Sequence, residues 1–209
     1  DLDEDYGVGS IWHRQEVLGE IVEFQGRVFP KFSRDKHVRA LPVGTKFRDV
    51  VGGVDFGNTD PMVAILIGTD ESGRRWVFKE FYQRRPKFAE FVALLSEWQY
   101  EYKVQRFYCD PHEPNVIDTL RSFGVPAVKG DARSIETRIR MINHLLDDVP
   151  GGPGVLFVEG EIIEGAREML TYRHDERTAG DERSFSDSIK KKQMDHFIDA
   201  FGMAVMGGL

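Results

Sequence analysis

The chain has 209 residues, of which 41% are hydrophobic and 30% are charged. It holds no run of about 18 apolar residues, which excludes a membrane-spanning helix and predicts a soluble globular protein with one sizeable domain. The single cysteine, Cys109, cannot form a disulfide within the chain, and no secretory signal opens it, so a reducing, intracellular compartment is expected. A balance of 28 basic against 35 acidic residues gives a net charge of −7. That charge argues against coating nucleic acid through bulk attraction, but it does not exclude an enzyme that holds divalent cations with clustered carboxylates.

The spacing of apolar residues predicts a mixed α/β domain that begins near Val50. Three strands in an antiparallel meander are expected first, at 50–57, 62–68 and 75–82, followed by an amphipathic helix over 87–102. Strands and helices are then expected to alternate, with strands at 106–110, 125–129 and 155–160 and helices at 114–121, 135–146 and 161–170. Residues 173–190 are polar and weakly patterned, and a last helix is expected to begin near Gln193. This order predicts a mixed sheet flanked by helices.

Residues 1–49 do not fit this order. They are mostly polar, carry Pro30 and Pro42, and predict an arm or linker that leads into the domain. The absence of a methionine at position 1 indicates a fragment of a longer protein or a processed product.

Acidic residues stand at the ends of two predicted strands and on the last helix. Asp55 closes one apolar strand and Asp110 closes another, and ligands gather at the carboxyl edge of such sheets. Asp195 and Asp199 are four residues apart in the last helix and therefore share a face, with His196 on its flank. If the opposite, apolar face of that helix packs on the sheet, these side chains can meet the two strand-end acids.

Carboxylates that converge on one point repel one another unless they are protonated or bind cations, and oxygen ligands suit Mg²⁺ or Mn²⁺. Two such ions roughly 3.5 to 4 Å apart can activate a water and stabilise the leaving oxygen of a phosphodiester. Two divalent cations are therefore expected, with Asp55 the candidate to bridge both ions because it lies on the central strand.

Other interpretations stay open at this point. A strand-end Asp is more often a turn or helix cap, and an acidic pair on a helix can simply be its solvated face. Cys109 beside His112 suggests a nucleophile, but adjacent strand residues face opposite ways, so Cys109 faces the core if Asp110 faces the site. The DFGNT segment from Asp55 resembles a phosphate loop of actin-like and sugar kinases, which would make the chain an ATP-binding domain. A non-catalytic docking module is a third possible function, but such a module would not need acidic residues at three separate strand or helix ends.

The whole pattern resembles the C-terminal nuclease domain of a tailed-bacteriophage terminase large subunit. The segments that carry the resemblance are FPKFSRDKHV at 29–38, GGVDFGNTDP at 52–61, FYCDPHEPNVIDTLRSFGVPA at 107–127, MLTYR at 169–173 and KKKQMDHFIDAFGMAV at 190–205. The DHxxDA form in the last segment is the most specific of these. One departure is visible: where many relatives read DALRY, this chain has Phe201, Gly202 and Met203 after Asp199-Ala200, so the arginine and tyrosine are missing.

The resemblance implies an RNase H-like fold and cleavage of double-stranded DNA with little sequence preference, using two Mg²⁺ or Mn²⁺ ions. It assigns metal-binding catalytic roles to Asp55, Asp110 and Asp199, an auxiliary acidic role to Asp195, and a proton-handling or orienting role to His196. Another RNase H-like nuclease, such as a junction resolvase, would use the same acids and a different DNA shape.

The resemblance also implies partners and boundaries. Residues 1–28 are expected to be the remnant of a preceding ATPase domain or its linker, and residues 29–209 the nuclease domain. The small terminase subunit and the portal are the further expected partners, in the cytoplasm of an infected host cell. DNA phosphates are expected to contact the basic residues near the last helix, namely Arg173, Arg183, Lys190, Lys191 and Lys192.

Overall fold

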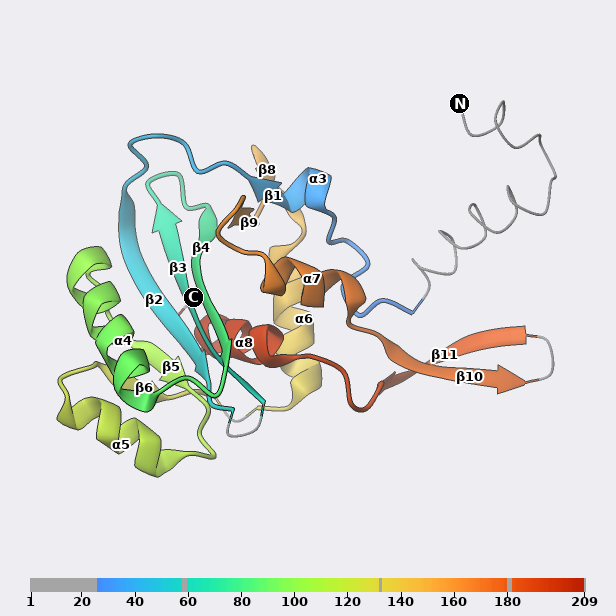
Figure 1. The fold of residues 1–209 in the computed structure, drawn as a ribbon. Helices are drawn as coiled ribbons and strands as arrows, with labels where there is room; N and C mark the ends of the chain where they lie inside the picture. The colour runs from blue at the N-terminus through green and yellow to red at the C-terminus, as the bar shows by residue number, and fades with distance from the viewer. Residues whose placement is uncertain (1–25, 58–59, 132, 180–181, 209) are drawn as a thin grey trace.

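The computed structural model describes residues 26–57, 60–131, 133–179 and 182–208. Within them, one sheet of seven strands lies between two layers of helices (Figure 1). In spatial order its strands are β1 (Val38–Arg39), β9 (Val155–Val158), β4 (Arg75–Arg84), β3 (Pro61–Asp70), β2 (Phe47–Asp55), β5 (Phe107–Cys109) and β6 (Ala127–Lys129). Strand β3 runs antiparallel to both of its neighbours, and the other adjacent pairs are parallel. The predicted meander extended by parallel strands is therefore confirmed.

Helices cover both faces of this sheet (Figure 1). One face carries α4 (Phe88–Tyr102) and α5 (Pro114–Ser122), and the other carries α6 (Ile135–Leu145), α7 (Glu164–Thr171) and α8 (His196–Gly208). A short helix, α3 (Arg34–His37), lies beside β1 and β9, and β7 (Asp148–Val149) pairs with β8 (Gly152–Pro153). The hairpin of β10 (His174–Ala179) and β11 (Glu182–Ile189) projects away from the body (Figure 1). Among the described residues, no helix is both long enough and apolar enough to cross a membrane.

Strict alternation along β3 fills both layers of the core. Val63, Ile65 and Ile67 are buried against the face that carries α8, whereas Ala64 and Leu66 are buried against the face that carries α4. Both sets are apolar because both faces of the central strands are covered by helices. This explains why the strand reads as one continuous hydrophobic run.

The N-terminal segment differs from the sequence-based expectation over its described part. Residues 26–49 do not form an arm, because Val28, Phe29 and Phe32 are buried in the same core cluster as α8. Val38 and Arg39 form the edge strand β1, which extends the sheet through parallel pairing with β9. The proposed boundary between residues 28 and 29 stays a prediction, since residues 1–25 lie outside the described part.

Helix α8 lies directly on β2 at their point of closest approach. A Cβ atom at Gly53 would overlap the backbone oxygen of Ala200 and stand 3.1 Å from the side chain of Ala204. Glycine in β2 and alanines in α8 therefore set the distance between the helix and the sheet.

This contact predicts that Gly53→Ala destabilises the fold by at least about 2 kcal/mol, because the helix has to move away from the strand. Urea unfolding of the two proteins measures the loss. Gly73→Ala serves as the comparison, since Gly73 has a φ of +87° and a Cβ atom there would meet no described atom within 4 Å. Only the backbone penalty of about 1 kcal/mol is expected there. Equal losses in the two variants would contradict the close contact between α8 and β2.

Candidate active site at the carboxyl edge of the sheet

Two of the predicted acids stand side by side at the ends of parallel strands. Asp55 is the last residue of β2, and Asp110 follows β5, whose Cys109 is in register with Val54. The backbone N–H of Asp110 donates to the carbonyl of Val54 at 3.0 Å, which continues the pairing by one residue. Asp55 shares the face of β2 that carries Gly53, and therefore faces α8.

The first turn of α8 brings the remaining predicted residues to the same edge. His196 begins the helix, three residues later than the predicted start, and its Nδ1 donates to Oδ2 of Asp55 at 3.0 Å. Asp195 precedes the helix, and its backbone carbonyl accepts the N–H of Asp199 at 2.8 Å. The two acids are therefore one helical turn apart. The hydroxyl of Tyr172 lies 3.4 Å from Oδ2 of Asp195.

Burial and mutual repulsion govern the protonation of these groups. Burial raises the pKa of Asp199 to about 7; the Arg138 guanidinium opposes that rise, and the charges of Asp195, Asp55 and Asp110 add to it. Burial likewise raises the pKa of Asp195. The hydrogen bond to Asp55 raises the pKa of the His196 imidazole. The acids from three separate segments are therefore close enough to influence one another.

Each acid also has a partner within the protein. Asp55 pairs with His196, and Oδ1 of Asp110 accepts from the backbone N–H and the ring of His112 at 3.0 and 2.7 Å. Asp199 forms an ion pair with Arg138, a residue of α6. Among the described residues, no three side chains of His, Cys, Asp or Glu lie close enough together to enclose a metal ion as they stand. The predicted metal ligands thus lie at the same edge of the sheet, and each of them is paired with another side chain of the protein.

Two residues under this site have no signal in the sequence. Glu168 of α7 is fully buried, and its Oε2 accepts the N–H groups of Phe197 and Ile198 at 2.9 and 3.3 Å. Its Oε1 accepts the hydroxyl of Tyr82 at 2.7 Å. A carboxylate at the first turn of α8 satisfies backbone donors and complements the helix dipole, so Glu168 fixes the end of the helix that carries His196. Arg138 is the other residue that sequence reasoning missed, because its partner is 61 positions away in the chain, from 138 to 199.

Four of the predicted DNA-binding residues, Arg173, Lys190, Lys191 and Lys192, lie at the base of the hairpin, whereas Arg183 lies near its far end. Lys190, Lys191 and Lys192 are exposed between β11 and α8. The backbone of Arg173 is clamped there by the side chain of Gln193, which accepts from its N–H at 2.9 Å and donates to its carbonyl at 2.8 Å. Arg183 is in β11, paired with Thr178, and its side chain lies outside the described part.

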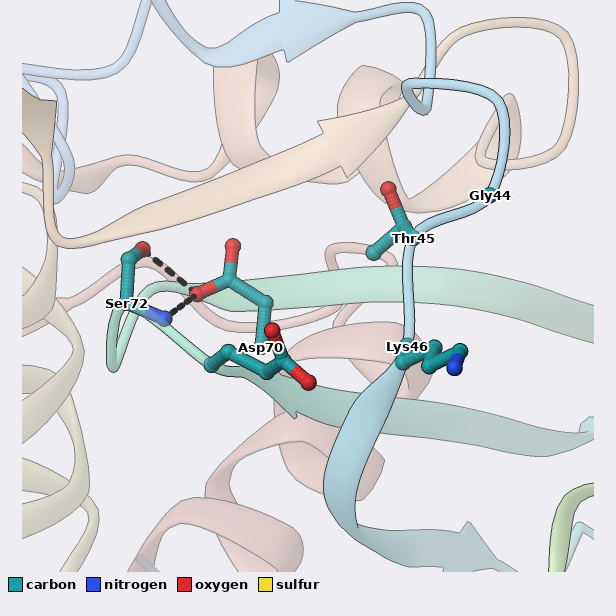
Figure 2. Close-up of a pocket in the computed structure, with 6 residues that line it drawn as sticks. Gly44, Thr45, Lys46, Asp70 and Ser72 are labelled. Atoms are coloured by element: carbon teal, nitrogen blue, oxygen red, sulfur yellow. Dashed lines mark hydrogen bonds between the residues drawn. The ribbon is translucent and has the colours of Figure 1, made fainter.

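The remaining candidates lie away from this chemistry. Cys109 is fully buried on the α4 side of the sheet, and burial raises the pKa of its thiol to about 12, which makes it an inert core residue. A hollow of about 400 Å³ is lined by Gly44, Thr45, Lys46 and the 70–72 turn (Figure 2). It lies at the opposite end of β2 from Asp55, and the Asp70 carboxylate is already engaged by Ser72 and neighbouring donors.

Solved structures of phage large terminases resemble this fold. A large terminase from a thermophilic bacteriophage matches with a TM-score of 0.68 and 22% identity, over 86% of this chain and 44% of that chain. The large terminase nuclease of the thermophilic phage G20c, with bound cobalt, matches with a TM-score of 0.62 and 17% identity, over 87% and 97% of the two chains. The nuclease domain of the bacteriophage SPP1 large terminase, with bound Mn, matches with a TM-score of 0.58 and 18% identity, over 80% and 95%.

These matches establish that the chain has the RNase H-like fold of terminase nuclease domains, as the motifs predicted. The chain spans less than half the length of the first of these large terminases. No protein-family model matches the chain, and no curated protein matches it significantly.

The raised pKa of Asp199 predicts a pH-dependent stability. In the folded, metal-free protein this carboxyl holds its proton from about pH 4 up to about pH 7, whereas the unfolded chain has released it. The free energy of unfolding therefore falls as the pH rises through this window, by up to about 4 kcal/mol for this one group. We expect Asp199→Asn to flatten the fall, measured by urea unfolding in EDTA. Asp118→Asn, on the exposed side of α5, should keep the wild-type slope, and an unchanged slope in Asp199→Asn would refute this account.

Proposed function

We propose that this chain is the nuclease domain of a bacteriophage DNA-packaging terminase large subunit. It cuts concatemeric double-stranded DNA with little sequence preference, as a phosphodiester hydrolase that uses two divalent cations, Mg²⁺ or Mn²⁺. One observation carries the proposal: Asp55, Asp110 and Asp199 approach one another from three separate segments at one edge of a sheet with the terminase nuclease fold. Bound Mn and cobalt in the SPP1 and G20c nucleases support the metal requirement.

The chemistry of the site fits divalent cations. Its side chains are carboxylates, whose hard oxygen atoms are the ligands that Mg²⁺ and Mn²⁺ prefer. Burial and the charges of neighbouring acids raise the pKa values of Asp195 and Asp199, so bound cations would relieve an unfavourable clustering of carboxylates. Asp55, Asp110 and Asp199 would hold the ions, with Asp195 as an auxiliary acid. When bound, such ions activate a water molecule and stabilise the leaving oxygen of a phosphodiester.

The residues around the acids have separate tasks in this proposal. His196 keeps a proton on Nδ1 toward Asp55, which orients that carboxylate and leaves the other edge of the imidazole for proton handling. Exposed Lys190, Lys191 and Lys192, with Arg173, would bind DNA phosphates beside the acids, and Arg183 would bind phosphates farther out along the hairpin. Glu168 holds the first turn of α8 in place beneath these contacts.

The proposal extends to partners. A longer chain would carry an ATPase domain before residue 29, and the assembled motor would contact the small terminase subunit and the portal. The site of action is the cytoplasm of the infected host cell. The longer large terminase of the thermophilic bacteriophage, of which this chain matches 44%, supports the presence of a further domain.

Cleavage of supercoiled plasmid tests the function. We expect nicking and linearisation in Mn²⁺ or Mg²⁺, none in EDTA, and a loss of at least about a hundredfold in Asp55→Asn and in Asp110→Asn. Both variants should stay folded, because asparagine keeps a side-chain oxygen that can accept the hydrogen bonds from His196 and His112 and removes a charge that repels the neighbouring carboxylates. Asp118→Asn, which removes an exposed carboxylate from α5, is the control and should cut normally.

Two results would count against this assignment. Asparagine variants that cut as fast as the wild type would remove these acids from the chemistry. A strong preference for a four-way junction over linear duplex would favour a resolvase.

Neutralising the three lysines should weaken DNA binding without changing the fold. For the variant with glutamine at Lys190, Lys191 and Lys192, we expect the slope of log K against log salt to become shallower by about 2 to 3. Fluorescence anisotropy of a labelled duplex at several salt concentrations measures this slope. The matched control places glutamine at Lys46, Lys103 and Arg106, which are exposed at the opposite edge of the sheet. Equal changes in both variants would mean that bulk charge, and not the segment before α8, binds the DNA.

A further inference from the structure

We infer that Arg138 is a positioning residue of the acidic site, a built-in cation that holds Asp199 and competes with divalent metal for it. This inference rests on the proposed function, because it concerns the same site. It assigns to α6 a part in a site whose other members come from β2, β5 and α8.

The geometry places Arg138 inside the site. Its Nη1 lies 2.8 Å from Oδ1 of Asp199, and its side chain is only 15% exposed, so solvent screens the pair weakly. Burial raises the pKa values of Asp195 and of the Tyr172 hydroxyl, and the charge of Arg138 opposes both rises. One guanidinium therefore interacts with three members of the group around α8.

Gly202 makes this approach possible. A Cβ atom at position 202 would stand 2.9 Å from Cδ of Arg138 and 3.4 Å from its Cβ and Cγ atoms. The aliphatic part of the arginine thus lies across the backbone of α8, one turn after Asp199. Because Gly202 has no side chain, the aliphatic part of Arg138 can pack there and its guanidinium can reach the Asp199 carboxylate. The Arg138–Asp199 pair therefore depends on the packing of α6 against α8.

The pair is nevertheless poorly satisfied. Nε and Nη1 of Arg138 are buried, and neither has a hydrogen-bond partner among the residues that the structure describes. The short approach to Asp199 is therefore an electrostatic contact without hydrogen-bond alignment. An arginine that permanently neutralised a carboxylate would be expected to donate two aligned N–H groups to it. Arg138 is thus suited to being displaced from Asp199 by a stronger cation.

The consequence for metal binding follows from Coulomb's law. A guanidinium in contact with Asp199 lowers the negative potential of the site and occupies one oxygen of a ligand. Removing its charge should strengthen the binding of Mn²⁺ by at least about tenfold, because even full solvent screening leaves an effect of that size for a unit charge a few ångströms from a divalent ion. A residue that merely supported the fold would not increase metal affinity when removed.

Calorimetric titration with Mn²⁺ tests the inference on the whole chain. We expect Arg138→Met, which keeps the aliphatic packing, to lower the dissociation constant at least about tenfold. Arg140→Met removes the same charge from the exposed side of α6 and should leave the constant unchanged. Gly202→Ala changes no charge but displaces Arg138, so it should also tighten binding, by less. If Arg138→Met fails to fold, Mn²⁺ binding by Gly202→Ala still tests the inference.

The outcomes separate the two proposals. Unchanged or weaker Mn²⁺ binding in folded Arg138→Met, with wild-type binding that Asp55→Asn abolishes, would overturn the role of Arg138 and leave the nuclease proposal standing. An equal increase in Mn²⁺ affinity in Arg140→Met would mean that only the net charge of the protein matters, and it would also overturn the role of Arg138. No Mn²⁺ binding by the wild type would overturn both proposals.

Discussion

The direct contact between α8 and β2 is the constraint on which the candidate site depends. Gly53 has no side chain, and Ala200 presents its backbone to it, so helix and strand approach as closely as backbones allow. Asp55 follows Gly53 by two residues on the same face of the strand, and Asp199 precedes Ala200 by one. A change in the spacing of these two elements would therefore move the acids apart, although no acid takes part in the contact.

Buried carboxylates also order the helices that support the site. Glu80 of β4 accepts the backbone N–H groups at the start of α7, from Ile163 and Glu164, both at 3.0 Å. Glu168 of α7 does the same for α8. Each glutamate lies on an element that precedes the helix it caps. Strand β4 is thus linked to α7, and α7 to α8, by hydrogen bonds from backbone N–H groups to a buried carboxyl group. The first turn of α8 thereby takes its position from the sheet by a second route, independent of Gly53.

The sequence was sufficient to predict the central part of the fold and the acids at the strand ends. Alternation and turn residues are local signals, and β2, β3 and β4 are long enough to display them. Edge strand β1 has two residues, Val38 and Arg39, too few for any periodicity, and it exists only through pairing with β9. The hairpin β10–β11 is polar, so its cross-strand pairing leaves no hydrophobic pattern.

The residues of the candidate site likewise fall into those that the sequence could predict and those that it could not. Asp55 and Asp110 could be found because a strand end is visible in the sequence, and Asp195, His196 and Asp199 because helical spacing is. Arg138 and Glu168 could not, since nothing local distinguishes a surface residue of an amphipathic helix from one that points at a distant carboxylate or helix end. Their contacts arise from tertiary packing between elements that are distant in the sequence, and no local sequence pattern indicates such packing.

The packing of Arg138 on Gly202 has a consequence for how such a site can change through evolution. The space that a side chain would fill at position 202 is taken by the aliphatic part of Arg138. A long residue at 202, such as the arginine of the DALRY pattern, and a long residue at 138 therefore exclude each other. Sequences related to this one should exchange residues at these two positions together, with small side chains at one accompanying large ones at the other.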